Sequence, residues 1–240
     1  MITLNSKEYG EKTAQLVSAR IVPYGVKDGR NRGDSMIRLE NLEVYNLGRA
    51  IYSARNPMNS WGKSDSDIEN DVLGENDLNL ANKLFKAGSD HSKFMRQIFV
   101  TVDITAPFYW WKEADTYKVG TVANSCSTMH KLMARPLELN DFSYDVDDLD
   151  FYEYLKNTIA YINGKMEEYH KAENMCRKWV IWRSIIMILP CCYNQRRTLT
   201  LNYAVLANML KARENHKLSE WREFCRFMYF KCPYLERIMR

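Results

Sequence analysis

The stretch from Ile104 to His130, ITAPFYWWKEADTYKVGTVANSCSTMH, decides the fold of this chain. It continues a β-branched run, Phe99–Thr105, whose apolar residues nearly alternate, and this pattern predicts a strand. Pro107 fits the first turn of a helix, where its missing backbone donor costs nothing. The small-residue segment Val119–Ala123 and short polar side chains then lead to His130. The stretch therefore predicts a strand that runs directly into a helix and a polar segment.

Four consecutive aromatic residues, Phe108–Trp111, occupy the beginning of this helix. They fit two roles: packing in the core, or stacking against the ring of a bound cofactor. Core packing is the favoured interpretation, because aromatic side chains dominate protein cores.

The frame of this stretch resembles the core of the flavin-dependent thymidylate synthases. In that family a strand passes through Ala-Pro into a helix that ends in R-H-R-x-x-S-x-N-x-x-S-x-R. The same frame here reads Thr116-Tyr117-Lys118, then Thr121 and Asn124, with Ser127 one place late. The resemblance implies that Lys118, Thr121 and Asn124 contact FAD.

The resemblance extends to residues on either side of this frame. It implies that Lys112, Glu113 and Ser127 bind the substrate. Between Gly88 and Ile98 the family carries Gly-His-x-(Ser/Thr)-Pro-Phe-Glu-His, and His91 is the match that would contact the cofactor. The proline of that motif is missing here and the spacing differs.

The C-terminal half resembles the family at fixed spacing. Pro190 is followed by Asn202 and Asn208, which match flavin contacts, and by Arg213, which matches a catalytic arginine against the nucleotide. In a helix predicted over Leu201–Arg213, Asn202 and Arg213 are eleven residues apart and share a face, whereas Asn208 points about 120° away. The alternative to this functional role is that Arg213 is a surface residue, whose charge is favoured by the dipole at the helix C-terminus.

The departures from the family motif concern its arginines. Of the three cationic positions in R-H-R, only the one occupied by Lys118 keeps a charge here. Thr128 stands where the motif ends in Arg, and Ala204 stands where the family has the Arg of Asn-x-Arg. Lysine does not replace arginine at a bidentate phosphate site. Compensation is expected from nearby cations: Arg183, Arg196 and Arg197.

Three functions follow from this balance. The first is a divergent flavin-dependent thymidylate synthase, which would methylate dUMP reductively to dTMP with FAD, NADPH and methylenetetrahydrofolate. The second is another nucleotide-modifying flavoenzyme, and the third is a non-catalytic nucleotide-binding homologue, because a shared fold does not fix a function. In the first case the cofactor carries the chemistry, and Cys126 is a neighbour of the site.

The remaining patterns predict an α+β fold in a single domain over residues 1–240, with helices packed around a mixed or antiparallel sheet. Further strands are predicted at Val17–Tyr24 and Ile37–Tyr45. Residues Asn59–Asn76 read as a surface loop and Cys191–Thr200 as irregular. The predicted helices are Val44–Arg55, Leu78–Ala87, Leu149–Ala172, Asn174–Leu189, Leu201–Arg213 and Leu218–Phe230.

Composition narrows the class of protein. Of the 240 residues, 46% are hydrophobic and 12% aromatic, which is typical of a globular chain. No signal or membrane-spanning segment is apparent, so a cytoplasmic protein without membrane contact is expected. A net charge of +4 gives no argument for nucleic acid.

No metal site is expected from the sequence. The six cysteines and four histidines lack ligand spacing, so free thiols are predicted. The acidic run around Asp147 and Asp148 lacks the glycine and glutamate of a calcium loop and fits the start of a helix instead.

A homotetramer with shared active sites is implied by the resemblance. Trp110, Trp111 and the helix that contains Trp221 are predicted to offer apolar surface for that assembly.

Overall fold

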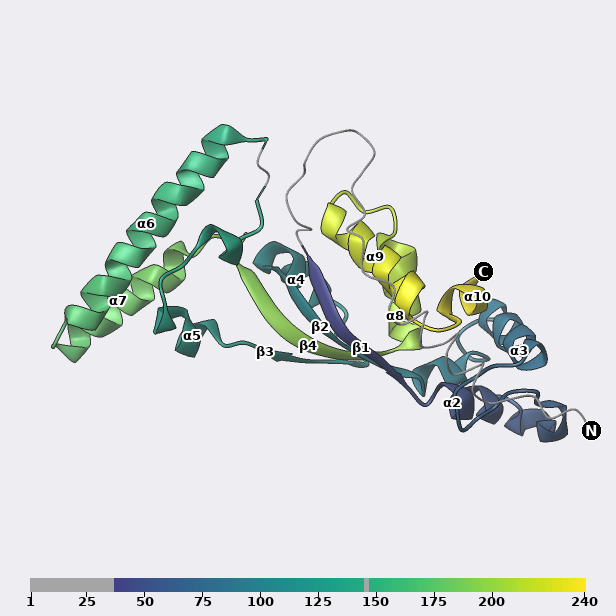
Figure 1. Ribbon diagram of the computed structural model, residues 1–240. Coiled ribbons are helices and arrows are strands. Elements are labelled where there is room, and N and C mark those ends of the chain that lie inside the picture. The colour runs from purple at the N-terminus through teal and green to yellow at the C-terminus, as the bar shows by residue number, and fades with distance from the viewer. Residues whose placement is uncertain (1–36, 145–146) are drawn as a thin grey trace, which may run out of the picture. The chain divides into compact units, whose positions relative to one another are not determined.

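The computed structural model describes residues 37–144 and 147–240. Its centre is a four-stranded antiparallel sheet in the order β1-β2-β4-β3 (Figure 1). The architecture is therefore α+β with an antiparallel sheet, as the sequence predicts. The strands are β1 (Arg38–Tyr45), β2 (Phe99–Pro107), β3 (Thr121–Ser125) and β4 (Asn194–Asn202).

Helices occupy most of the remaining described chain. The α-helices are α2 (Leu47–Ser53), α3 (Glu75–Lys86), α4 (Phe108–Ala114), α5 (Thr128–Lys131), α6 (Leu149–Lys171), α7 (Met175–Ile188), α8 (Tyr203–Arg213), α9 (Ser219–Lys231) and α10 (Leu235–Met239). Short 3-10 helices lie in the connections: η1 (Asn56–Met58), η2 (Trp61–Lys63), η3 (Lys93–Arg96), η4 (Leu132–Ala134) and η5 (Leu139–Asp141).

One face of the sheet carries the main core. Alternate residues of β2, from Val100 to Ala106, are buried there against α4, α8 and α9. Trp110, Trp111 and Trp221 are fully buried in this core, with the rings of Trp110 and Trp221 4.6 Å apart. The core-packing interpretation of the helix aromatics is thus confirmed for both Trp110 and Trp111. The expectation that Trp110 and Trp111 offer surface for assembly is wrong, and Trp221 of the last long helix is buried as well.

The opposite face of the sheet is polar. Asp103 of β2 lies at its centre and accepts hydrogen bonds from Thr198 (2.6 Å), Arg196 (2.7 Å) and Asn41 (2.9 Å). These donors hold the pKa of Asp103 down to about 2, with the Thr198 hydroxyl as the largest cause. The strands thus place Arg196 on the face away from the core.

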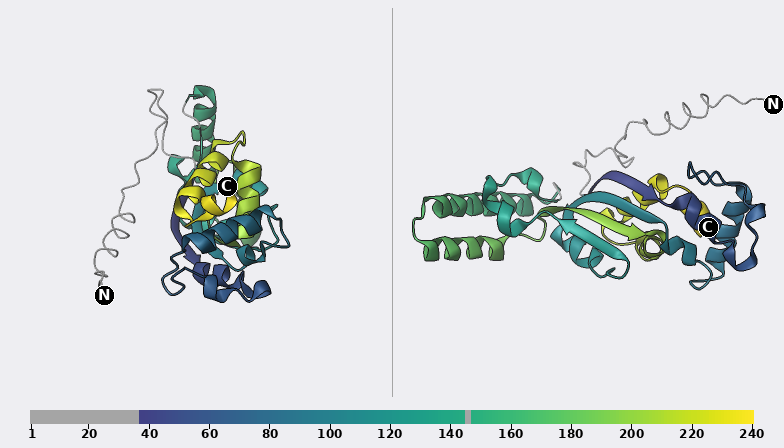
Figure 2. Two further views of the ribbon diagram at one scale, coloured as in Figure 1. Left: turned by 90° about the vertical axis from the view of Figure 1, so that its right-hand side faces the viewer. Right: turned by 90° about the horizontal axis from the view of Figure 1, so that it is seen from below.

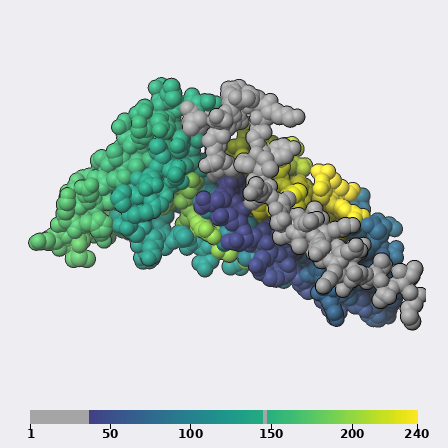
Figure 3. Space-filling model, in the orientation of Figure 1, coloured from purple at the N-terminus to yellow at the C-terminus, as the bar shows by residue number. Residues whose placement is uncertain are grey.

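A second apolar core lies under the hairpin of α6 and α7. It includes Ile159 and Ile162 of α6 and Ile181 and Ile185 of α7. Figure 2 shows the two helices side by side beyond one end of the sheet, and their surface is teal and green in Figure 3. Tyr109 of α4 packs against both cores.

The sequence interpretation fails most clearly at Cys191–Thr200. Predicted as irregular, this segment contains most of β4, and the strand continues through Leu201 and Asn202, which were assigned to the following helix. Gln195 is a buried polar residue of the strand, and its side chain donates to the carbonyl of Cys126 at 2.7 Å. A local pattern cannot show that a polar residue at a core position has such a distant partner.

Other boundaries shift by a few residues. The helix predicted from Val44 begins at Leu47, because the residues before it pair with β2. Helix α3 starts at Glu75 and ends before Gly88, whose φ of 108° suits glycine. Pro107 is the last residue of β2 and the N-cap of α4, one position earlier than predicted.

The predicted hairpin helices are confirmed. The side chain of Asp148 accepts a hydrogen bond from the Phe151 amide at 2.9 Å and caps α6, as expected from the acidic run.

The strand predicted at Val17–Tyr24 lies outside the described residues. None of the helices that the structure describes has the length and hydrophobicity required of a membrane span.

Candidate functional site

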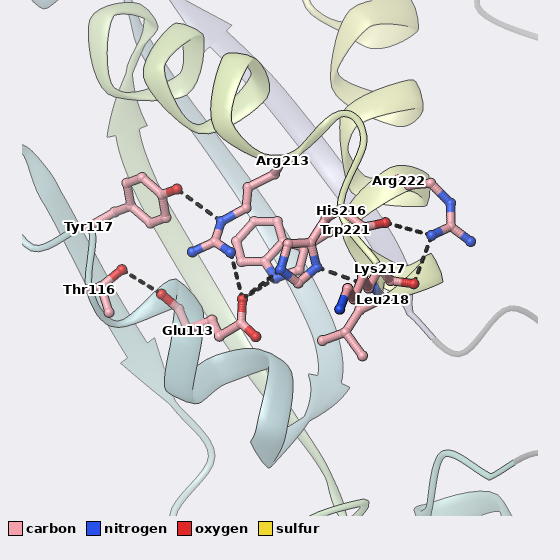
Figure 4. A network of polar contacts seen from close by, with 9 residues as sticks. All are labelled: Glu113, Thr116, Tyr117, Arg213, His216, Lys217, Leu218, Trp221 and Arg222. Carbon is pink, nitrogen blue, oxygen red and sulfur yellow. Dashed lines mark hydrogen bonds and ion pairs between the residues drawn. The ribbon is translucent and has the colours of Figure 1, made fainter.

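Glu113 and Arg213 meet at the centre of the candidate site. Glu113 lies near the end of α4, and Arg213 is the last residue of α8. Arg213 Nη1 donates to Glu113 Oε2 at 2.7 Å, and its Nε donates to the Tyr117 hydroxyl at 3.0 Å (Figure 4). The structure thus brings together two residues that the resemblance assigns to the substrate.

The same carboxylate oxygen joins two further residues. Glu113 Oε2 accepts from Trp221 Nε1 at 3.1 Å and lies 3.3 Å from His216 Nε2. His216 Nδ1 accepts from the Leu218 amide at 3.2 Å, so Nε2 carries the proton of the neutral ring. Glu113 of α4 therefore contacts α8 through Arg213, α9 through Trp221, and the loop between α8 and α9 through His216.

Arg213 keeps one nitrogen for a ligand. Its guanidinium lies over the Trp221 ring at 4.9 Å, and its side chain is 20% exposed. Nη2 has no hydrogen-bond partner among the described residues, and Figure 4 shows it directed away from Glu113, on the side of Tyr117. Arg213 is therefore held in place by two of its nitrogens, while the third remains available to a ligand. This differs from the interpretation of Arg213 as an unconstrained surface residue at a helix C-terminus.

A cavity of about 250 Å³ adjoins this network. Tyr117 belongs to both, because its hydroxyl meets Arg213 and its side chain lines the cavity. The lining residues come from the end of α4, the loop after it, β3, β4 and α8: Trp111, Ala114, Asp115, Tyr117, Lys118, Thr121, Ala123, Leu199 and Met209. The hydroxyl oxygen of Thr121 is buried without a hydrogen-bond partner, so a polar ligand atom there would satisfy it.

The cavity does not fit a complete FAD molecule. Its volume is below the roughly 300–1,000 Å³ of typical small-molecule sites, so it suits a single ring. Lys118 is an exposed cation at its edge. Arg197 is already engaged, because it pairs with Asp115 at 2.7 Å and stacks on Trp111 at 4.3 Å. The described residues that line this cavity thus form no complete pyrophosphate cradle within one chain.

Strand β3 separates two of the residues matched to FAD contacts. Ala123 pairs with Leu199, and both line the cavity together with Thr121. Asn124 pairs with Thr198 on the polar face of the sheet, since successive side chains of a strand point to opposite sides. Thr121 and Asn124 therefore cannot contact the same side of one ligand within one chain.

Asn202 has a local role that the sequence did not reveal. It is the N-cap of α8, where its side chain accepts from the Val205 amide at 3.0 Å, so the helix geometry predicted for Asn202 and Arg213 does not apply. Gly120, with φ of 77°, lies against Asn202, and a Cβ there would stand 3.0 Å from Asn202 Nδ2. Asn208 is exposed on α8.

The other matched residues lie apart from the Glu113–Arg213 network. Lys112 is exposed on α4, and His91 is exposed in the turn after α3. Ser127 caps α5 by accepting from the His130 amide at 3.3 Å. Arg183, which was expected to compensate for lost arginines, lies on α7 over the ring of Trp179.

Three residues of the network were missed as site residues. Tyr117 was noted only as the residue that stands where the family motif has histidine. His216 lies in the loop after α8 and gives no pattern in the sequence. Trp221 was predicted only as part of the apolar stripe of the last long helix. An indole pairs with a carboxylate only once the fold brings α4 and α9 together, so no local signal marks either residue.

Comparison with known proteins supports the fold. No family model and no curated protein sequence matches this chain. Among solved structures, flavin-dependent thymidylate synthase ThyX from Helicobacter pylori, complexed with FAD and dUMP, matches with a TM-score of 0.61 and 15% sequence identity over 86% of this chain and 100% of that chain. A second structure of ThyX from Helicobacter pylori, also with FAD and dUMP, gives 0.60 and 15% over 84% and 94%. The described chain therefore has a fold similar to that of the flavin-dependent thymidylate synthases.

Proposed function

We propose that this protein is a divergent flavin-dependent thymidylate synthase that binds a pyrimidine nucleotide at the cavity beside Arg213. The observation that carries the proposal is the position of Arg213, which is fixed by Glu113 and by Tyr117, a residue that lines the ring-sized cavity. The fold supports it, because both Helicobacter pylori structures hold FAD and dUMP.

In this proposal the residues of the chain bind and orient the nucleotide. Tyr117 offers an aromatic wall to the base, and Arg213 Nη2 donates to an acceptor atom of the ligand. Lys118 provides a positive charge at the edge of the cavity, as a point charge for a phosphate.

The flavin, when bound, would supply the redox chemistry of methyl transfer with NADPH and methylenetetrahydrofolate as co-substrates. Because one chain does not enclose FAD, we propose that residues of several chains hold it in a homotetramer. In that assembly His91, Asn124 and Asn208 are exposed enough to meet a ligand from another subunit, and so are Lys112 and Lys118.

A non-catalytic nucleotide-binding protein is the second candidate. It is favoured by the close pairing of Arg213 with Glu113, which neutralises the one arginine that retains the family position. The replacement of R-H-R by Thr116-Tyr117-Lys118 also favours the non-catalytic protein, because it removes two arginines of the family motif.

One assay separates the two candidates. Purified protein is incubated with FAD, NADPH, methylenetetrahydrofolate and dUMP, and dTMP is measured by chromatography. A thymidylate synthase forms dTMP in proportion to enzyme, and Arg213→Ala lowers the rate at least tenfold. Binding of dUMP in calorimetry without any dTMP formation supports the non-catalytic protein. Absence of both binding and product refutes the proposed nucleotide site.

A further inference from the structure

One oxygen of the Glu113 carboxylate receives every donor that its side chain meets among the described residues. Oε2 accepts from Arg213 Nη1 at 2.7 Å and from Trp221 Nε1 at 3.1 Å, and it lies 3.3 Å from His216 Nε2. The other oxygen, Oε1, has no such contact, and Figure 4 shows it directed away from Arg213. The carboxylate therefore presents a single oxygen to the guanidinium.

The pair of Arg213 with Glu113 lacks the second contact that such pairs commonly form. Arginine and carboxylate often pair through two parallel N–H···O bonds, because the planar fork of the guanidinium matches the two oxygens. Here Nε already donates to the Tyr117 hydroxyl at 3.0 Å, so a second bond to Glu113 beside that of Nη1 would come from Nη2. The single-oxygen contact leaves Nη2 unused, and this is the nitrogen that the proposed function assigns to the nucleotide.

Trp221 and His216 account for the orientation of the carboxylate. Both reach Oε2 from α9 and the loop before it, whereas Arg213 reaches it from the end of α8. The Glu113 side chain is 34% exposed and has room to turn, but a turn that brings Oε1 onto Arg213 moves Oε2 away from both donors. Trp221 is fully buried in the main core. The His216 side chain is 23% exposed, so it can be replaced without opening that core.

The imidazole of His216 is fixed on its opposite side. Nδ1 accepts from the Leu218 amide at 3.2 Å, so the neutral ring carries its single N–H on Nε2 and directs it at Glu113. The backbone is held as well, because the His216 amide donates to the Arg213 carbonyl at 3.0 Å and Arg222 Nη1 donates to the His216 carbonyl at 2.6 Å. The loop between α8 and α9 thus presents one neutral donor to the carboxylate.

We propose that His216 is a positioning residue for nucleotide binding. By holding Oε2 of Glu113, it limits the contact with Arg213 to one oxygen and keeps Nη2 free. His216 does not line the cavity, so it acts through Glu113 and Arg213 alone. Nη2 meets a pyrimidine nucleotide only under the proposed function, on which this inference rests. A neutral donor suits the role, because a cation in its place would compete with Arg213 for the same carboxylate.

Two substitutions separate this role from a purely structural one. His216→Gln places an amide N–H near the position of Nε2 and removes the acceptor of the Leu218 amide. His216→Asn does the opposite, because its side-chain oxygen lies near the position of Nδ1 and no donor reaches Glu113. A residue that only stabilises the loop would therefore tolerate asparagine better than glutamine, whereas the positioning role requires the reverse order.

Calorimetric titration with deoxyuridylate measures that order. His216→Asn should weaken binding roughly tenfold, the effect of one lost hydrogen bond from a guanidinium, while His216→Gln should stay within about twofold of the parent. Circular dichroism verifies that both variants are folded. Any result in which His216→Gln binds no more tightly than His216→Asn, with a parent that binds, overturns the proposal.

Crystal structures of the two variants without nucleotide test the geometry separately from the proposed function. His216→Asn is expected to show both oxygens of Glu113 on Arg213, and His216→Gln to show one. A single-oxygen contact in both variants overturns the positioning role, whatever the protein binds. A parent that does not bind deoxyuridylate, together with a two-oxygen contact in His216→Asn alone, would refute the proposed function and support the control of Arg213 by His216.

Discussion

Substitution of Arg213 by alanine gives the sharpest prediction for the site, because it changes stability and ligand binding by separable amounts. The change removes the 2.7 Å ion pair with Glu113, the 3.0 Å hydrogen bond to Tyr117 and the stacking over Trp221. Glu113 keeps Trp221 and His216 as donors, so its carboxylate is not left bare.

The stability cost follows from exposure. The Arg213 side chain is 20% exposed and that of Glu113 is 34% exposed, which places the pair between a surface and a buried ion pair. We expect Arg213→Ala to lower the free energy of unfolding by about 1–2 kcal/mol, the low end for a charge-assisted hydrogen bond with the discount for screening. This exceeds the few tenths of a kcal/mol expected for a surface arginine. Urea denaturation measures it, with exposed Arg226→Ala as the matched control.

The binding cost rests on the free Nη2. One lost hydrogen bond from a guanidinium should weaken nucleotide binding at least tenfold, or about 1.4 kcal/mol. Calorimetric titration with deoxyuridylate and with deoxyuridine tells which part of the ligand Arg213 contacts. An equal loss for both ligands places the base at Arg213, whereas a loss for deoxyuridylate alone places the phosphate there. Arg213→Lys should restore little, because an ammonium cannot replace the planar fork. Unchanged affinities in Arg213→Ala, with a parent that binds, would refute the role of Arg213.

Three further outcomes are expected. Asp77→Ala should destabilise the protein by about 3–5 kcal/mol in urea denaturation, because it leaves Arg55 buried without its partner at 2.5 Å; a cost below 1 kcal/mol would contradict a buried pair. Asp103, whose pKa falls from 3.8 to about 2 on folding, stabilises the protein above pH 4, and this contribution is lost as the pH falls from 4 to 2. Asp103→Asn should remove that part of the acid transition in a circular dichroism titration, and an unaltered transition would count against it. Lys118→Ala should weaken FAD binding by about 1–3 kcal/mol in a fluorescence titration if the cation meets a phosphate, and equal affinity would exclude it from the site.

Periodic patterns predicted the parts of the fold that depend on local sequence. The alternation in Phe99–Thr105 gave β2, and the apolar stripe with Trp221 gave a helix whose buried side is the one expected. Strand β4 was missed because its polar residues at inward positions have partners on distant segments. Arg197, for example, is held by Asp115 and by the ring of Trp111, and neither contact leaves a trace in the local pattern.

The sequence predicted two residues of the network, Arg213 and Glu113, and two residues of the cavity lining, Lys118 and Thr121. The contact between Arg213 and Glu113 was not predicted, because it joins the ends of α4 and α8. Asn124 and Thr121 match one continuous motif, but the alternation of β3 sends them to opposite faces. Residue spacing thus locates candidates along the chain, and only strand register shows which of them share a surface.

The most direct test of the proposed function is the absorption spectrum of the protein after FAD is added and unbound FAD is removed by gel filtration. A flavin-dependent thymidylate synthase is expected to retain FAD and show the visible absorption bands of a flavin, at close to one flavin per chain. A colourless protein after the same treatment, with folding verified by circular dichroism, would contradict the proposal that this chain uses a flavin.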